Sequence, residues 1–254
     1  MPGETHQLSA FSSLILALGL ILGAWILGSE IRDIRMADRY VSVRGLAERI
    51  VKSDLAIWPL RFREAGNDLK ATFSQSEQDR QAVLDFLARQ GIPKSDITVG
   101  QPNVVDTQAN EFGPEKHPYR FIVEQEVAVR STNVDQIAAA VQKTNELIAR
   151  GVVIGASNYE FRGGGVSYLF TGLNAVKPEM ISEATHNARA AAERFAADAG
   201  SKVGTIRQAS QEPFSITSAD DTSPAGQGPG VDQSAGSMMK KVRVVTMVDF
   251  YLGK

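Results

Sequence analysis

The stretch RFIVEQEVAVR, residues 120–130, carries the most regular pattern in the chain. Apolar and polar side chains alternate along it, with Phe121, Val123, Val127 and Val129 on one side and Glu124, Glu126 and Arg130 on the other. An alternation with a period of two is typical of a β-strand that buries one face and exposes the other. The stretch therefore predicts a sheet that is covered on one side.

Three segments with apolar side chains at three- and four-residue steps predict the helices that cover this sheet. They are residues 67–90, 133–150 and 177–199. Each is followed by a glycine (Gly91, Gly151 and Gly200), which accommodates the left-handed backbone just beyond a helix. Pro178 is expected in the first turn of the third helix, where its missing N–H is tolerated.

Segments rich in branched and aromatic residues predict the strands, which are residues 40–46, 54–63, 95–106, 120–130, 152–161, 167–171, 203–214 and 240–252. Pro59 cannot donate a hydrogen bond to a neighbouring strand, so an edge position or a bulge is expected there. Residues 215–237 are rich in Gly, Ser, Asp and Pro and predict a long mobile loop inside the domain. This order of elements predicts an α+β fold with a largely antiparallel sheet and helices packed on one face.

The N-terminal part has a different character. Residues 11–28, FSSLILALGLILGAWILG, contain no charge and would span roughly 27 Å as a helix, close to the thickness of a bilayer core. They predict a transmembrane anchor between a tail of residues 1–10 and a charged stalk of residues 29–39, with the folded domain over residues 40–254. The side chains expected in the membrane include Phe11, Leu14, Leu18, Ile21, Trp25 and Leu27.

Two other interpretations of the apolar segment stay open. A cleaved signal peptide is disfavoured because no Lys or Arg precedes the segment and no A-x-A sequence follows it. The third interpretation is a buried core helix. The arginines after the segment (Arg32, Arg35, Arg39 and Arg44) favour a cytoplasmic domain under the positive-inside rule.

The composition excludes several kinds of site. The chain has no cysteine, which excludes disulfides and thiol chemistry, and its net charge of −2 excludes a generally basic nucleic-acid binder. Its histidines (His6, His117 and His186) lack metal-ligand spacing. Glu124 and Glu126 form a carboxylate pair that we expect on a solvated face. No catalytic residue, metal ligand or cofactor site is predicted.

Three stretches carry a resemblance to a known family: VSVRGLAERIVKSDLAIWPLRF (residues 41–62), DLKATFSQSEQDRQAVLDFLARQGIPKSDITV (residues 68–99) and KPEMISEATHNARAAAERFAADAGSKVGTIRQASQEPF (residues 177–214). In their order and spacing they resemble the bacterial SIMPL-domain proteins, also called the DUF541 family. The family includes a periplasmic immunogenic protein and a protein associated with oxidative-stress defence. The resemblance implies a domain in the periplasm that forms ring-like or channel-like homo-oligomers, and it implies no established catalytic residue.

The anchor and the resemblance together lead to a functional expectation. We expect a non-enzymatic envelope protein of the inner membrane that faces the periplasm, self-assembles and is linked to oxidative or envelope stress. One alternative is an adaptor that binds other envelope proteins through residues 215–237. Another is a hydrolase or redox enzyme whose site between subunits uses Glu124, Glu126 and His186.

Overall fold

A computed structural model describes residues 39–109, 118–155, 165–220 and 235–253. These residues form an α+β fold with antiparallel sheets, as predicted, and they divide into two compact units. Unit 1 holds the described residues of 1–47, 179–214 and 244–254, and unit 2 holds those of 48–178 and 215–243. Two long strands, β1 (Tyr40–Lys52) and β9 (Met239–Gly253), contribute residues to both units.

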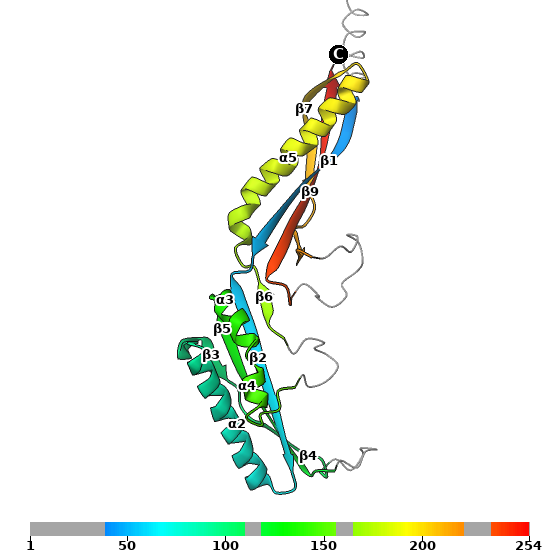
Figure 1. The fold of residues 1–254 in the computed structure, drawn as a ribbon. Helices are drawn as coiled ribbons and strands as arrows, with labels where there is room; N and C mark the ends of the chain where they lie inside the picture. Colours follow the sequence, from blue (N-terminus) through cyan, green and yellow to red (C-terminus); the bar gives the residue numbers. More distant parts are fainter. Residues whose placement is uncertain (1–38, 110–117, 156–164, 221–234, 254) are drawn as a thin grey trace, which may run out of the picture. The chain divides into compact units, whose positions relative to one another are not determined.

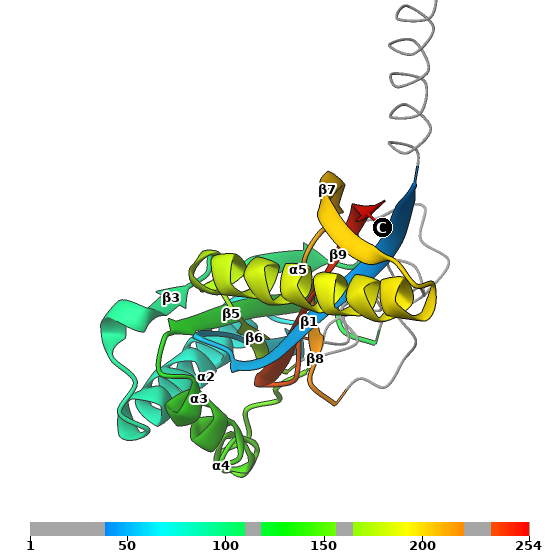
Figure 2. The same cartoon turned by 90° about the horizontal axis from the view of Figure 1, so that it is seen from above.

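Unit 1 consists of a helix on one face of a sheet. The sheet has the order β1, β9 and β7 (Lys202–Gln211), so β9 is its central strand. Helix α5 (Leu173–Asp198) belongs to unit 1 from Glu179 onward and lies along these strands (Figure 1). Seen from above, it crosses over β1 and β9 (Figure 2).

Small side chains bring α5 close to this sheet. Four alanines at four-residue intervals, Ala184, Ala188, Ala192 and Ala196, are buried on the inner face of the helix. Opposite them lies Gly45 of β1, where a Cβ atom would overlap the carbonyl oxygen of Ala184 and lie 2.6 Å from the backbone nitrogen of Ala188. The absence of a side chain at Gly45 therefore sets how closely helix and sheet approach.

Unit 2 contains a second sheet with helices on one of its faces. Its central strands, β2 (Leu55–Gly66) and β5 (Phe121–Ser131), pair in continuous antiparallel register. The other strands of this sheet are β3 (Ile97–Val99) and β4 (Asn103–Asp106), which pair with β5, and β6 (Ser167–Leu169), which pairs with β2. Strand β8 (Ser215–Ser218) pairs with β9 and so belongs to the other sheet. The helices are α2 (Leu69–Arg89), the 3₁₀-helix η1 (Lys94–Asp96), α3 (Val134–Val141) and α4 (Asn145–Ile148).

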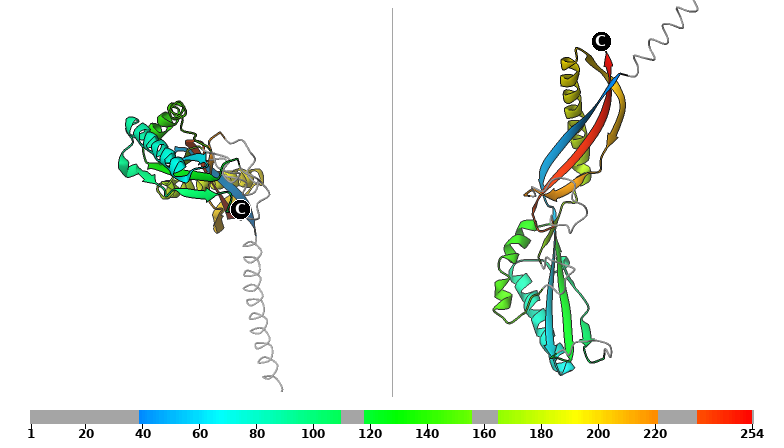
Figure 3. Two further views of the ribbon diagram at one scale, coloured as in Figure 1. Left: turned by 90° about the horizontal axis from the view of Figure 1, so that it is seen from below. Right: turned by 90° about the vertical axis from the view of Figure 1, so that its right-hand side faces the viewer.

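The core of unit 2 lies between β2, β5 and the helices, which lie on the same side of the sheet in the right panel of Figure 3. Alternate residues of the strands supply its apolar side chains, including Trp58, Leu60, Phe62, Val127 and Val129. The rings of Trp58 and Phe86 of α2 meet edge to face, with their centroids 6.3 Å apart. Helix α2 begins after Asp68, whose carboxylate accepts a hydrogen bond from the N–H of Ala71 (2.7 Å).

Several predicted boundaries differ from the structure. Helix α5 begins at Leu173 rather than near Lys177, because the carboxylate of Asp54 accepts hydrogen bonds from the N–H groups of Thr171 (2.8 Å) and Gly172 (2.9 Å) directly before it. Pro178 is therefore inside the helix and not in its first turn. The missing N–H leaves one carbonyl of the opening turns without its helical partner, a loss that the rest of the long helix tolerates.

Three further segments form shorter or divided elements where the sequence predicts continuous ones. The expected strand of residues 95–106 is divided into β3 and β4, which pair with β5 in registers one residue apart, and Pro102 between them lacks an N–H. The expected helix of residues 133–150 is divided into α3 and α4. Residues 152–155, expected as the start of a strand, contain a single bridge, from Ile154 to Phe62.

The expected loop of residues 215–237 begins with a strand. Its first residues form β8, because Ile216 and Thr217 are β-branched and pair with β9. Residues 221–234 lie outside the described part of the chain. Pro59 takes the expected edge position, because β6 pairs only with residues 55–57 of β2.

The predicted anchor, with Phe11, Leu14, Leu18, Ile21, Trp25 and Leu27, also lies outside the described residues. Among the helices that the structure describes, none is long and apolar enough to cross a membrane.

Candidate functional site

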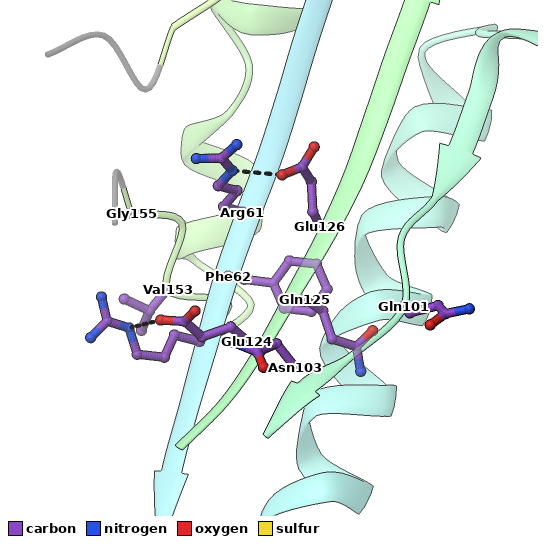
Figure 4. A pocket seen from close by; sticks show the side chains of 10 residues that line it. Arg61, Phe62, Gln101, Asn103, Glu124, Gln125, Glu126, Val153 and Gly155 are labelled. Carbon is purple, nitrogen blue, oxygen red and sulfur yellow. Dashed lines mark hydrogen bonds and ion pairs between the residues drawn. The ribbon is translucent and has the colours of Figure 1, made fainter. Parts of the chain in front are cut away.

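A pocket of about 600 Å³ lies in unit 2, beside strands β2 and β5 (Figure 4). Its lining combines charged side chains, amides and a few apolar groups: Arg61, Phe62, Arg63, Gln101, Asn103, Glu124, Gln125, Glu126, Val153 and Gly155. The pocket is therefore polar, and the arrangement of its charged side chains determines what chemistry it could support.

The register of the two central strands brings the charges together. Arg61 is the direct neighbour of Glu126, and Arg63 is the direct neighbour of Glu124. The Nε of Arg61 donates to Oε2 of Glu126 at 2.6 Å, and Nε of Arg63 lies 3.6 Å from Oε1 of Glu124 (Figure 4). Because alternate residues of a strand share a face, two arginines and two glutamates form two adjacent ion pairs.

These ion pairs limit the chemistry of the carboxylates. A carboxyl group that acts as a general acid or a nucleophile needs the protonation state that the reaction requires. Each glutamate here instead faces a guanidinium group that is always positively charged. The four side chains are between about one third and one half exposed, so the pairs contribute little to stability. The arrangement fits a structural cross-strand ladder better than paired acid–base catalysts.

A second polar cluster lies between α2 and the covered face of the same sheet. Asp79 of α2 is only 5% exposed, and its Oδ1 accepts a hydrogen bond from Nε2 of Gln75 (3.2 Å). Near it, the buried Gln125 of β5 donates from Nε2 to Oε1 of Glu77 (3.0 Å), and Glu77 also pairs with Arg80. Within the described residues, no donor nitrogen reaches Oδ2 of Asp79.

Glu64 of β2 has a pKa that depends on Asp79. Burial, followed by a side-chain hydrogen bond with Asp79 and the negative charge of Asp79, raises the pKa of Glu64 from 4.5 to about 7. Two carboxyl groups can share a hydrogen bond only if one of them keeps a proton. Glu64 therefore keeps its proton to a higher pH than an exposed glutamate does.

We expect this pair to make the stability of unit 2 depend on pH. Between about pH 4.5 and about pH 7 the folded chain holds a proton on Glu64 that the unfolded chain releases, so the free energy of unfolding falls as the pH rises through this window. Urea unfolding at several pH values across the window, followed by the fluorescence of Trp58, measures the slope. The variant Glu64→Gln should flatten it.

Glu124→Gln is the matched control, because it also removes one glutamate from the same sheet but leaves Glu64 and Asp79 in place. Its slope should follow the unmodified protein. An identical pH dependence in Glu64→Gln and in the unmodified protein would contradict the raised pKa of Glu64.

His186, the histidine that the structure describes, does not add to either cluster. His186 is exposed on α5 and belongs to unit 1, whereas Glu124 and Glu126 belong to unit 2. His6 and His117 lie outside the described residues. In the ranges that the structure describes, no group of His, Asp and Glu side chains could hold a metal ion.

The sequence pattern predicts the two glutamates but not their partners. The alternation Arg-x-Arg in β2 and Glu-x-Glu in β5 is the signal for the ion pairs, and it becomes specific only once the register is known. Nothing in the sequence singles out Glu64 and Asp79, because each is one charged residue in a segment that contains several.

Two antiparallel sheets, one covered by α5 and the other by α2, α3 and α4, thus define an α+β protein. The chain matches the model of the SIMPL family, described as a protein of unknown function (DUF541), over residues 41–249, and it belongs to that family. No curated protein matches the chain.

Proposed function

We propose that this SIMPL-family protein is a membrane-anchored envelope component that faces the periplasm and self-assembles through its folded domain, without catalytic activity. Two features support the proposal. The uncharged residues 11–28 have the length and composition of a single membrane span. The sheet of unit 1 has an unpaired edge along β1 among the described residues, and this edge is the observation on which the self-assembly rests.

An unpaired edge strand presents N–H and C=O groups to which another strand can bond. Strand β1 has 13 residues, and only β9 pairs with it in the described structure. The carbonyl of Arg39 accepts from the N–H of Leu252 (2.9 Å), so the odd-numbered residues at this end bond to β9. The even-numbered residues Ser42 and Arg44 therefore direct their backbone groups to the free edge.

A proline at an even position tests this edge. Arg44→Pro should remove one outward N–H while leaving the bonds to β9 intact, and we expect the assembly to dissociate into smaller particles with the circular dichroism spectrum unchanged. Light scattering coupled to size-exclusion chromatography of the full chain in detergent gives the particle mass.

Val43→Pro is the control, because its N–H is directed to β9 and its side chain is buried. This variant should lose folded structure in unit 1 rather than assembly alone. A monodisperse monomer for the unmodified chain, or an unchanged particle mass for a folded Arg44→Pro variant, would reject self-assembly through this edge.

A reporter fused after Lys254 tests the proposed side of the membrane. A reporter that is active only in the periplasm should be active in this fusion, and activity of a cytoplasmic reporter instead would place the domain on the other side, as the arginine flank favours.

A further inference from the structure

Four segments of unit 1 meet at the end of its sheet where β1 begins. The N–H of Leu252 in β9 bonds to the carbonyl of Arg39 (2.9 Å), and Lys202 of β7 pairs with Gly253 of β9. Helix α5 ends beside them, because the N–H of Ser201 bonds to the carbonyl of Ala196 (2.8 Å). We call this region, residues 39–41, 195–207 and 251–253, the stalk end of unit 1.

The stalk end combines exposed apolar or aromatic side chains with cations. Phe195 is 62% exposed in the last turn of α5, and Tyr40 and Ile206 are also exposed. Arg207 lies over the ring of Tyr40, with its guanidinium carbon 4.2 Å from the ring centroid. Lys202, like Arg39, is exposed. A protein surface that contacts lipid headgroups characteristically has this mixture of aromatic rings and cations.

Cations outnumber carboxylates in this region. The stalk end contains Arg39, Lys202 and Arg207 against one carboxylate, Asp198. Asp249 lies next to the region, and its carboxylate accepts a hydrogen bond from the hydroxyl of Ser42 (2.6 Å). The local charge is therefore positive although the whole chain has a net charge of −2.

The sequence places this region close to the proposed anchor. Eleven residues, 29–39, separate the end of the apolar segment from the start of β1. They reach about 16 Å as a helix and at most about 40 Å when extended. Strand β1 therefore begins within this distance of the bilayer surface whichever conformation the stalk adopts.

We propose that the stalk end of unit 1 docks on the headgroup layer of the membrane that holds the anchor, with its cations on anionic phospholipids and its aromatic rings in the interfacial zone. The inference rests on the proposed anchor and adds a second contact between the protein and the bilayer. This contact would orient unit 1 at the surface, whereas the anchor alone would tether it without fixing its orientation.

The absence of cysteine in the chain makes a clean test possible, because a single introduced cysteine can carry a spin label. Thr205→Cys places the label at the stalk end without altering the proposed contact residues. Ser210→Cys is the matched control, since it is exposed on the same strand and about 17 Å further from this end. The full chain is reconstituted in vesicles of phosphatidylethanolamine and phosphatidylglycerol, and flotation of the vesicles reports anchoring.

Collision of the label with oxygen, which partitions into lipid, and with a water-soluble nickel chelate measures its surroundings. We expect the label at position 205 to be shielded from nickel and accessible to oxygen, and the label at position 210 to be accessible to nickel. Equal nickel accessibility at both positions in chains that float with the vesicles would reject docking while leaving the anchor intact. Chains that do not float would overturn both the anchor and the docking proposal.

Charge variants test the proposed chemistry. Each cation near an anionic surface changes the docking equilibrium by about fivefold, so Lys202→Gln should lower the ratio of docked to free unit 1 by that factor. Arg44→Gln is the control, because it removes an exposed cation about 13 Å along β1 from Tyr40, beyond the screening length of about 8 Å. Vesicles of phosphatidylcholine should weaken docking for all variants. An equal response to anionic and zwitterionic vesicles would overturn the role of anionic headgroups.

Discussion

Replacing Gly45 by valine should unfold unit 1 or destabilise it by about 3 kcal/mol or more, because the new side chain has no space between β1 and α5. Even its Cβ atom would overlap the carbonyl oxygen of Ala184 and lie 2.6 Å from the nitrogen of Ala188. Both of these are backbone atoms of a helix and cannot move aside alone. We expect a lower melting temperature by circular dichroism and faster hydrogen exchange of the α5 amides.

Gly253→Val is the matched control for this prediction. Gly253 also lies in a strand of unit 1, but a Cβ atom there would meet only the carbonyl oxygen of Lys202, at 3.9 Å. This variant should keep a melting temperature close to that of the unmodified protein. Equal melting temperatures for the two variants would contradict the close approach of α5 and β1.

Phe86→Ala should cost unit 2 about 3 to 5 kcal/mol of its free energy of unfolding, since the substitution leaves a large cavity in the core. Phe86 is fully buried in the core, and its ring meets that of Trp58 edge to face. Urea unfolding followed by the fluorescence of Trp58 measures the loss. A Trp25→Phe background leaves Trp58 as the sole tryptophan.

Phe73→Ala provides the comparison within the same helix. Phe73 is 38% exposed, so its removal loses less buried apolar surface, and we expect a cost of about 1 kcal/mol or less. Similar losses from the two variants would mean that Phe86 does not occupy the centre of the core.

Local periodicity predicted most of the elements but not their division into two units. The alternation in residues 120–130 predicted β5, and the apolar stripe of residues 67–90 predicted α2. The start of α5 could not be predicted, because it depends on Asp54, whose carboxylate bonds to the N–H of a residue 117 positions away. The single expected sheet is in fact two, because period-two patterns do not specify which strands are partners.

Less of the candidate site than of the fold could be predicted from the sequence. Glu124 and Glu126 were recognised as a pair on one face, but the arginines that face them follow from the register of β2 against β5. The contact of Glu64 with Asp79 depends on how α2 packs over the sheet. Such packing is a tertiary property that neither segment encodes alone.

The order of segments in unit 1 has a consequence for how the chain folds. Ser42 of β1 bonds to Asp249 of β9, which is 207 residues later, so the sheet of unit 1 forms only when nearly the whole chain has been synthesised. Unit 2 draws most of its elements from the continuous stretch of residues 48–178 and can collapse earlier. Both edges of β1 therefore stay unpaired until β9 has been synthesised. An unpaired strand can pair with a strand of a neighbouring copy, so the nascent chain is most prone to such pairing during this time.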